Sequence, residues 1–160
     1  MNKPKTGMRK GPVSFIIVDN KHLTKIGVRN LIQKSKRLYL VTTNKNHPAV
    51  QFQKKLDLIY YPREINFNDL FQRLKKQYKI SRVTVQSGGT LKAILARSEL
   101  IDRVSLVVAP ALIGGKDTST LLDGPSLRME KDLKHIKTLQ LIKSQKLKNS
   151  YLHLVYEVVN

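Results

Sequence analysis

Residues 82–117 read RVTVQSGGTLKAILARSELIDRVSLVVAPALIGGKD and contain the most informative pattern in the chain. Alternating apolar residues predict a strand over residues 83–85. A helix with one apolar face should follow the two glycines, and the continuous apolar run 104–109 predicts another strand. The apolar face of that helix comprises Leu91, Ile94 and Leu95. The stretch is therefore expected to fold as strand, glycine turn, helix and strand.

The turn itself, Ser87-Gly88-Gly89-Thr90, fits two interpretations. The start of a helix offers free N–H groups and the positive end of the helix dipole, and glycine lets a ligand approach the backbone closely. Hydroxyls from Ser87 and Thr90 could add hydrogen bonds to a phosphate. The segment is neither a dinucleotide-binding Gly-x-Gly-x-x-Gly fingerprint nor a P-loop. On local chemistry alone, a phosphate site and an ordinary tight turn remain equally good explanations.

The rest of the chain predicts an α/β fold. The clearest helix is 67–78, where Phe67, Leu70, Phe71, Leu74 and Tyr78 form one apolar stripe that we interpret as core. Strands alternating with helices indicate a mainly parallel sheet covered on both faces, a three-layer αβα arrangement. Two β-rich runs near the C-terminus predict an antiparallel hairpin. The other predicted elements are strands 13–18, 38–41 and 56–61, a short helix 47–55, and hairpin strands 136–143 and 151–159, which flank the polar loop 144–150.

Composition narrows the class of protein. The 160 residues carry 30 Lys and Arg against 11 Asp and Glu, a formal net charge of +19. Such a charge fits an anionic partner, nucleic acid included, or a solvated lysine-rich surface. The absence of cysteine excludes disulfides and thiolate metal sites and suits the cytoplasm. No apolar run is long enough for a membrane span. We expect a basic flexible lead over residues 1–11 and a single domain over residues 12–160.

Several isolated polar residues are best interpreted as structural. The four histidines lack metal-ligand spacing, so no metal site is expected. Asp19 and Asp102 fit turn or cap positions better than acid–base catalysis. Thr42 and Thr43, at the end of a predicted strand, could reach an adenosine 2′-phosphate, although strand-end threonines commonly have structural roles.

The spacing of several motifs resembles one enzyme family. Val83-x-Val85-x-x-Gly88-Gly89-Thr90-Leu91 is followed by Leu100-Ile101-Asp102 and then by Val107-Val108-Ala109-Pro110-x-Leu112-Ile113-Gly114-Gly115. This order is similar to that of the riboflavin-biosynthesis reductases, which include the C-terminal domain of the bifunctional deaminase-reductase and have a dihydrofolate-reductase-like fold. The resemblance covers residues 12–159.

The resemblance implies a cofactor and the residues that bind it. Ser87, Gly88, Gly89, Thr90 and Leu91 lie where the family binds the NADPH diphosphate. Asn20 takes the place of a family serine that contacts the cofactor. Gln86 stands where many members carry a substrate-contacting glutamate, so it is the predicted substrate-binding residue.

The implied function is NADPH-dependent reduction of a phosphorylated aminopyrimidine of the riboflavin pathway, by a cytoplasmic homodimer. No catalytic residue is assigned. Family members begin with a Ser-x-Asp-Gly-like strand, and only eleven residues, four of them basic, precede Pro12 here. The domain is therefore expected to be an incomplete copy. The alternative is a non-catalytic, truncated relative that binds nucleotide or nucleic acid through a basic surface.

Overall fold

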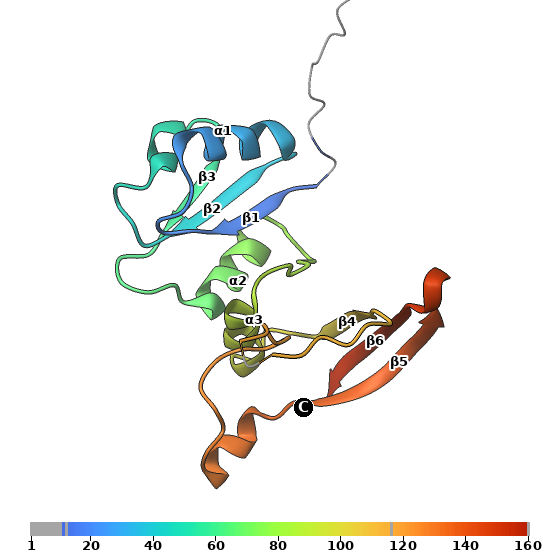
Figure 1. The fold of residues 1–160 in the computed structure, drawn as a ribbon. Coiled ribbons are helices and arrows are strands. Elements are labelled where there is room, and N and C mark those ends of the chain that lie inside the picture. Colours follow the sequence, from blue (N-terminus) through green and yellow to red (C-terminus); the bar gives the residue numbers. More distant parts are fainter. Residues whose placement is uncertain (1–10, 12, 116, 160) are drawn as a thin grey trace, which may run out of the picture. The chain divides into compact units, whose positions relative to one another are not determined.

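A computed structural model describes residues 11, 13–115 and 117–159. The chain divides into two compact units, Met1–Asn66 and Phe67–Asn160, which we describe in turn (Figure 1). Of the predicted basic lead, only Gly11 is within the described residues, and its N–H donates to the Lys34 carbonyl over 2.8 Å.

The first unit is built on a parallel sheet. Strands β1 (Phe15–Val18), β2 (Leu38–Thr42) and β3 (Asp57–Tyr60) lie in the order β1-β2-β3. All five residues of the central strand β2 are buried, as expected for a strand between two neighbours in a covered parallel sheet. A 3-10 helix, η1 (Pro48–Phe52), lies within the predicted helix 47–55. The core of this unit comprises Val28, Leu38, Leu40, Ala49 and Leu56.

Helix α1 (Lys25–Lys34), between β1 and β2, is an addition to the elements predicted from the sequence (Figure 1). Thr24 caps it, because the Thr24 hydroxyl oxygen accepts the Gly27 N–H over 3.2 Å. Val28 is fully buried, and Leu31 and Ile32 pack against the core. Only three apolar residues thus fix the helix against the sheet, which explains its weak signal in the sequence.

The second unit contains helices α2 (Phe67–Lys76) and α3 (Gly89–Arg97) and an antiparallel sheet. In the sheet, β4 (Arg103–Val108), β6 (Leu152–Val159) and β5 (Thr138–Lys146) lie in the order β4-β6-β5. The predicted C-terminal hairpin is confirmed as β5–β6, and its loop is shorter than expected because β5 continues to Lys146. Strand β4 extends the hairpin to three strands. Two 3-10 helices, η2 (Glu130–His135) and η3 (Lys148–Ser150), complete the unit.

Helix α2 confirms the predicted apolar stripe. Leu70 and Leu74, one turn apart, are each 2% exposed. On the polar side, Asp69 and Arg73 form an i,i+4 ion pair with an Nε–Oδ2 distance of 2.9 Å. The helical period of the sequence therefore identified the buried face correctly.

The predicted strand 83–85 is wrong, because residues 79–88 form neither helix nor strand. Val83 and Val85 are half-buried while Arg82, Thr84 and Gln86 are exposed, so the alternation that suggested a strand is real. A strand also requires a hydrogen-bonded neighbour, and this segment belongs to neither sheet. Alternation of apolar residues is therefore not sufficient for a strand.

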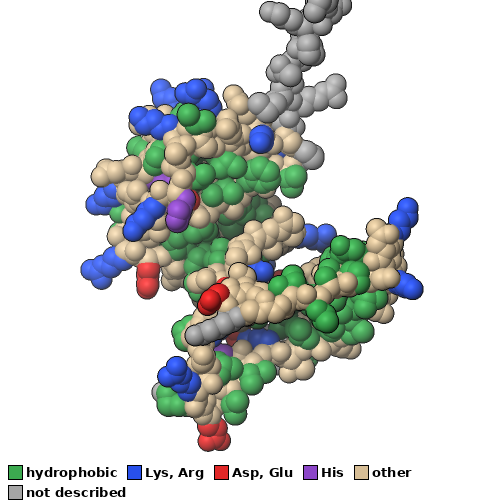
Figure 2. All heavy atoms as spheres, in the orientation of Figure 1, with side chains coloured by type: hydrophobic (Ala, Val, Ile, Leu, Met, Phe, Trp, Pro, Cys, Tyr) green, Lys and Arg blue, Asp and Glu red, His purple; other side chains and the backbone are tan. Residues whose placement is uncertain are grey.

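The sheet of the second unit has one apolar face. Residues directly opposite each other in antiparallel strands share a face. The pairs Val104–Tyr156, Leu106–Leu154 and Val108–Leu152 therefore lie on one side, together with Leu139 and Leu141 of β5. Leu141 is 51% exposed, and Val108, Leu139 and Leu152 are also exposed. Figure 2 shows hydrophobic side chains gathered over this sheet.

Candidate functional site

Polar residues of the first unit gather where the parallel strands end. Asp19 and Asn20 follow β1, and Thr43 and Asn44 follow β2. The carboxyl ends of parallel strands lie at the same edge of a sheet, which is the usual location of ligand sites in open α/β folds. We call Asp19, Asn20, Thr42, Thr43 and Asn44 the strand-end cluster.

Asn20 is the centre of this cluster. Its Oδ1 accepts the Thr42 hydroxyl over 3.1 Å and the Thr43 N–H over 2.8 Å. Its carbonyl accepts the Asn44 side-chain amide over 3.0 Å. Asn20 thus ties the end of β1 to the end of β2. Thr42 is fully buried and its hydroxyl also accepts the Asn44 N–H, so Thr42 has the structural role of a strand-end threonine.

Asp19 of the cluster forms a buried hydrogen-bonded pair with His47. The Nε2 of His47 lies 2.9 Å from Asp19 Oδ2, and His47 is 1% exposed. The Ala49 N–H donates to His47 Nδ1 over 3.0 Å. Because Nδ1 is an acceptor, the ring proton is on Nε2 and is donated to Asp19. The pair is therefore a neutral histidine hydrogen-bonded to a carboxylate, with the structural role expected for both residues.

The carboxyl of Asp19 has a strongly perturbed pKa. Burial disfavours the charged form and raises the pKa, but four hydrogen bonds favour it and outweigh burial. The donors are the His47 ring, the backbone N–H groups of Leu23 and His22, and the His22 ring. The pKa of Asp19 is lowered from 3.8 to about 2. Asp19 is thus an anion that fixes the loop after β1, and it is unsuited to act as a general acid near neutral pH.

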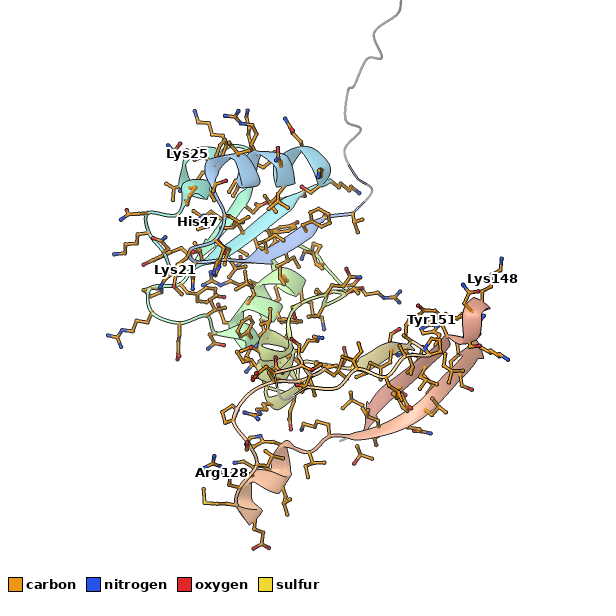
Figure 3. The ribbon with its side chains drawn as sticks, in the orientation of Figure 1. Lys21, Lys25, His47, Arg128, Lys148 and Tyr151 are labelled. Carbon is orange, nitrogen blue, oxygen red and sulfur yellow. The ribbon has the colours of Figure 1, made fainter. Side chains whose placement is uncertain are left out.

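Lysines adjoin the strand-end cluster in the sequence. Lys21 follows Asn20 directly, Lys45 follows Asn44, and both are exposed. Lys25 begins α1, whose first turn contains no acidic residue. Figure 3 shows Lys21 and His47 at the end of the parallel strands. This edge of the first unit is therefore electrostatically suited to an anionic ligand.

The glycine turn opens helix α3 of the second unit, as predicted. Gly88 is the N-cap residue, and among the described residues no side-chain cap hydrogen bond is made there. A Cβ added to Gly88 would meet nothing within 4 Å, so the space beside the turn is open. The Ser87 hydroxyl donates to the Gly88 carbonyl over 3.2 Å. The first turn of α3 therefore keeps the free N–H groups that an anion would need.

The other side of the turn is occupied by an acidic side chain. A Cβ at Gly89 would collide with the carboxylate of Asp123 and would lie 2.9 Å from its backbone nitrogen. Glycine at position 89 is thus required by the close approach of Asp123. Nothing in the local sequence signals this contact, because the two residues are separated by the whole of α3 and β4.

The predicted site residues fall into two groups. Ser87, Gly88, Gly89, Thr90 and Leu91 lie together around the start of α3, and the side chain of Gln86 is exposed just before them. Asn20 belongs to the first unit, in the strand-end cluster. Neither the Asn20–Thr43 contact nor the Asp19–His47 contact could be predicted from local patterns, since each joins the loops that follow two different strands.

Within residues 11, 13–115 and 117–159, no three His, Asp or Glu side chains are grouped so that they could hold a metal ion. None of the helices in this part of the chain is long and apolar enough to cross a membrane.

Sequence comparison identifies the family. The model of the RibD C-terminal domain family matches residues 2–152, and the chain belongs to that family. The chain is 26% identical over 126 residues to the 2,5-diamino-6-ribosylamino-4(3H)-pyrimidinone 5′-phosphate reductase of Archaeoglobus fulgidus, covering 78% of this chain and 57% of that protein. The enzyme of the same name from Methanothermobacter thermautotrophicus is 24% identical over 121 residues, covering 75% and 50%. The chain thus spans about half the length of these relatives.

Solved structures confirm the fold. RibD of Acinetobacter baumannii superposes with a TM-score of 0.70 at 19% identity, over 90% of this chain and 37% of that chain. A pyrimidine reductase-like protein of Corynebacterium diphtheriae gives a TM-score of 0.61 at 13% identity, over 91% and 60%. The predicted α/β class and dihydrofolate-reductase-like fold are therefore correct.

Proposed function

We propose that this chain is an NADPH-dependent reductase of the riboflavin-pathway type, which acts on a 5-amino-6-ribosylaminopyrimidine phosphate or a related compound. Its family and the names of its relatives support a nicotinamide-dependent reduction and a phosphorylated pyrimidine substrate. The NADPH cofactor, the exact substrate and the residue roles are part of the proposal.

The observation that carries the proposal is the uncapped start of α3. Gly88 leaves open space beside helical N–H groups that have no side-chain partner at the cap. A diphosphate accepts hydrogen bonds from such groups and is attracted by the helix dipole. The residues present fit the diphosphate on the Gly88 side, with Ser87 and Thr90 as additional hydroxyl donors.

Asn20, in the strand-end cluster, is the other residue that we assign to cofactor contact. Asn20 Oδ1 is held by Thr42 and Thr43, which fixes the orientation of its amide. The side-chain NH2 is left as the donor that could contact a ligand. Lys21 and Lys45 provide positive charge that would favour a 2′-phosphate, the group that distinguishes NADPH from NADH.

When bound, NADPH supplies the hydride, and the protein has to position the substrate and exclude competing reactions. Gln86 is the residue we assign to substrate contact. Its amide can donate and accept hydrogen bonds, whereas a glutamate at this position could only accept them at neutral pH. Gln86 would therefore bind the substrate without placing a negative charge near its phosphate.

Titration with NADPH tests the proposal. The chain contains no tryptophan, so the fluorescence of the reduced nicotinamide can be followed without interference from indole. We expect saturable binding below millimolar cofactor and weaker binding of NADH. Absence of binding at millimolar NADPH would refute the assignment for this chain.

Three further predictions remain part of the proposal. We propose that residues 12–160 act as one reductase domain, that the protein is cytoplasmic, and that it forms a homodimer. The apolar face of the second unit's sheet, defined above, supports the last point, because exposed apolar patches of this kind mark protein–protein contacts.

A second candidate is binding of nucleic acid. The observation in its favour is the net charge of +19, which exceeds what one cofactor and one phosphorylated substrate require. Lys148 at the tip of the β5–β6 hairpin is one of the contributing residues (Figure 3). Affinity for random DNA that falls steeply with salt concentration would support this function.

A further inference from the structure

Residues 120–125, which we call the strap, lie against helix α3. At one end of the helix, the Asp123 carboxylate is packed on Gly89. At the other end, Arg97 Nη2 donates to the Pro125 carbonyl over 2.7 Å. The strap is therefore attached to both ends of the helix that the glycine turn opens.

The carboxylate of Asp123 is oriented by its own segment. The Thr120 hydroxyl is hydrogen-bonded to Asp123 Oδ1 and lies 2.9 Å from the Leu122 carbonyl. Gly124 follows with a φ of +132°, a conformation that only glycine adopts without strain. The turn thus places a negative charge at the positive end of the α3 dipole, where a carboxylate is favoured.

We propose that the strap is a displaceable lid, in which Asp123 occupies part of the anion position at the start of α3 and leaves when a diphosphate binds. The inference rests on the proposed function, since it takes the glycine turn as the diphosphate site. Two anions cannot share one helix start without strong repulsion. The closed strap therefore competes with the cofactor.

The attachment of the strap suits reversible opening. Leu121 and Leu122 are 49% and 50% exposed, so the strap gains little from burying apolar surface. The contacts described above that hold it are polar and can be exchanged for contacts with water or with a ligand. Opening would cost little free energy. Because the cofactor binds only when the strap is open, its apparent affinity is reduced in proportion to the fraction of molecules with an open strap.

The test is substitution of Asp123 by asparagine. Asp123→Asn removes the charge and keeps the size of the side chain. The matched control is Asp117→Asn, which makes the same change in net charge in the loop that leads to the strap. The dissociation constants of inorganic pyrophosphate and of NADPH would be measured for both variants and for the unchanged protein.

We expect Asp123→Asn to bind pyrophosphate and NADPH about two- to thirtyfold more tightly than the unchanged protein, the range corresponding to one charge at a helix start. Asp117→Asn should leave both constants within a factor of two. Hydrogen exchange supplies an independent readout, since NADPH should increase exchange in residues 118–125 as the strap leaves.

The outcomes separate the two proposals. If the proteins bind NADPH but Asp123→Asn gives no gain over Asp117→Asn, the lid is refuted and the cofactor site stands. Increased protection of the strap by NADPH would equally exclude displacement. If none of the three proteins binds pyrophosphate or NADPH, the proposed diphosphate site fails and the lid fails with it.

Discussion

Acidification should weaken the first unit through Asp19. The folded-state pKa of Asp19 is about 2, below its ordinary value of 3.8. Because the folded-state pKa is lowered, the ionised carboxylate stabilises the folded protein fully above the unfolded pKa, and this contribution disappears as the pH falls through about 2. Asp19 is 8% exposed, so the contribution is little screened by solvent. It amounts to about 2 kcal/mol, since one pKa unit corresponds to about 1.4 kcal/mol.

Comparison with Asp19→Asn isolates this effect from the titration of other carboxyls. Asparagine cannot ionise. Its NH2 group would face N–H groups whose hydrogen bonds the Asp19 carboxylate accepts in the unchanged protein. At pH 7 the free energy of unfolding of the variant should be lower by about 2 kcal/mol or more. Between pH 5 and pH 2 the difference should shrink by about 2 kcal/mol.

Urea unfolding at a series of pH values, followed by circular dichroism, measures both proteins. Asp117→Asn, which removes an exposed carboxylate, provides the control, and we expect it to lie within about 0.5 kcal/mol of the unchanged protein throughout. A difference between the unchanged protein and Asp19→Asn that stays constant from pH 7 to pH 2 would refute the stabilising role of the ionised Asp19 carboxylate.

The remaining predictions concern cofactor binding, association and core packing. Gly88→Asp should weaken NADPH binding by about tenfold or more while leaving the fold intact, because aspartate caps the first N–H groups of α3 and adds a negative charge in the open space. Gly88→Ser caps the same N–H groups without a charge and should weaken binding by a smaller factor. Leu141→Glu should convert the proposed dimer to a monomer, whereas Gln140→Glu, which adds the same charge on the opposite face of the sheet, should not. Light scattering measures the molar mass of both variants. Leu74→Ala should lower the free energy of unfolding by about 2–5 kcal/mol in urea titrations, because Leu74 is buried; a loss below about 1 kcal/mol would contradict its place in the core.

The sequence predicted elements whose signal is local. The apolar stripe located α2, and the polar run before residue 151 located the hairpin turn. These predictions succeeded because each depends on periodicity or turn chemistry within one segment. Helix α1 was not predicted, because only three of its apolar residues contact the core and its periodic signal is weak.

The family, too, was accessible from the sequence, since its motif consists of glycines and prolines at fixed spacing between apolar runs. The same spacing placed the glycine turn at the start of α3, where the structure has it. Glycine positions of this kind can be recognised in a sequence, because the local backbone conformation dictates which residue occurs there.

Three features required the tertiary structure. Residues 83–85 alternate like a strand but pair with no strand of the described part of the chain. Asp19 and His47 meet across 28 residues because β1 and β2 are adjacent and parallel, and Asp123 reaches Gly89 from beyond β4. The sequence alone thus located helices α2 and α3, the hairpin turn and the family to which the chain belongs. Strand pairing and the partners of its charged groups were decided only by the tertiary fold, because hydrogen bonds and electrostatic forces act through space between residues far apart in the chain.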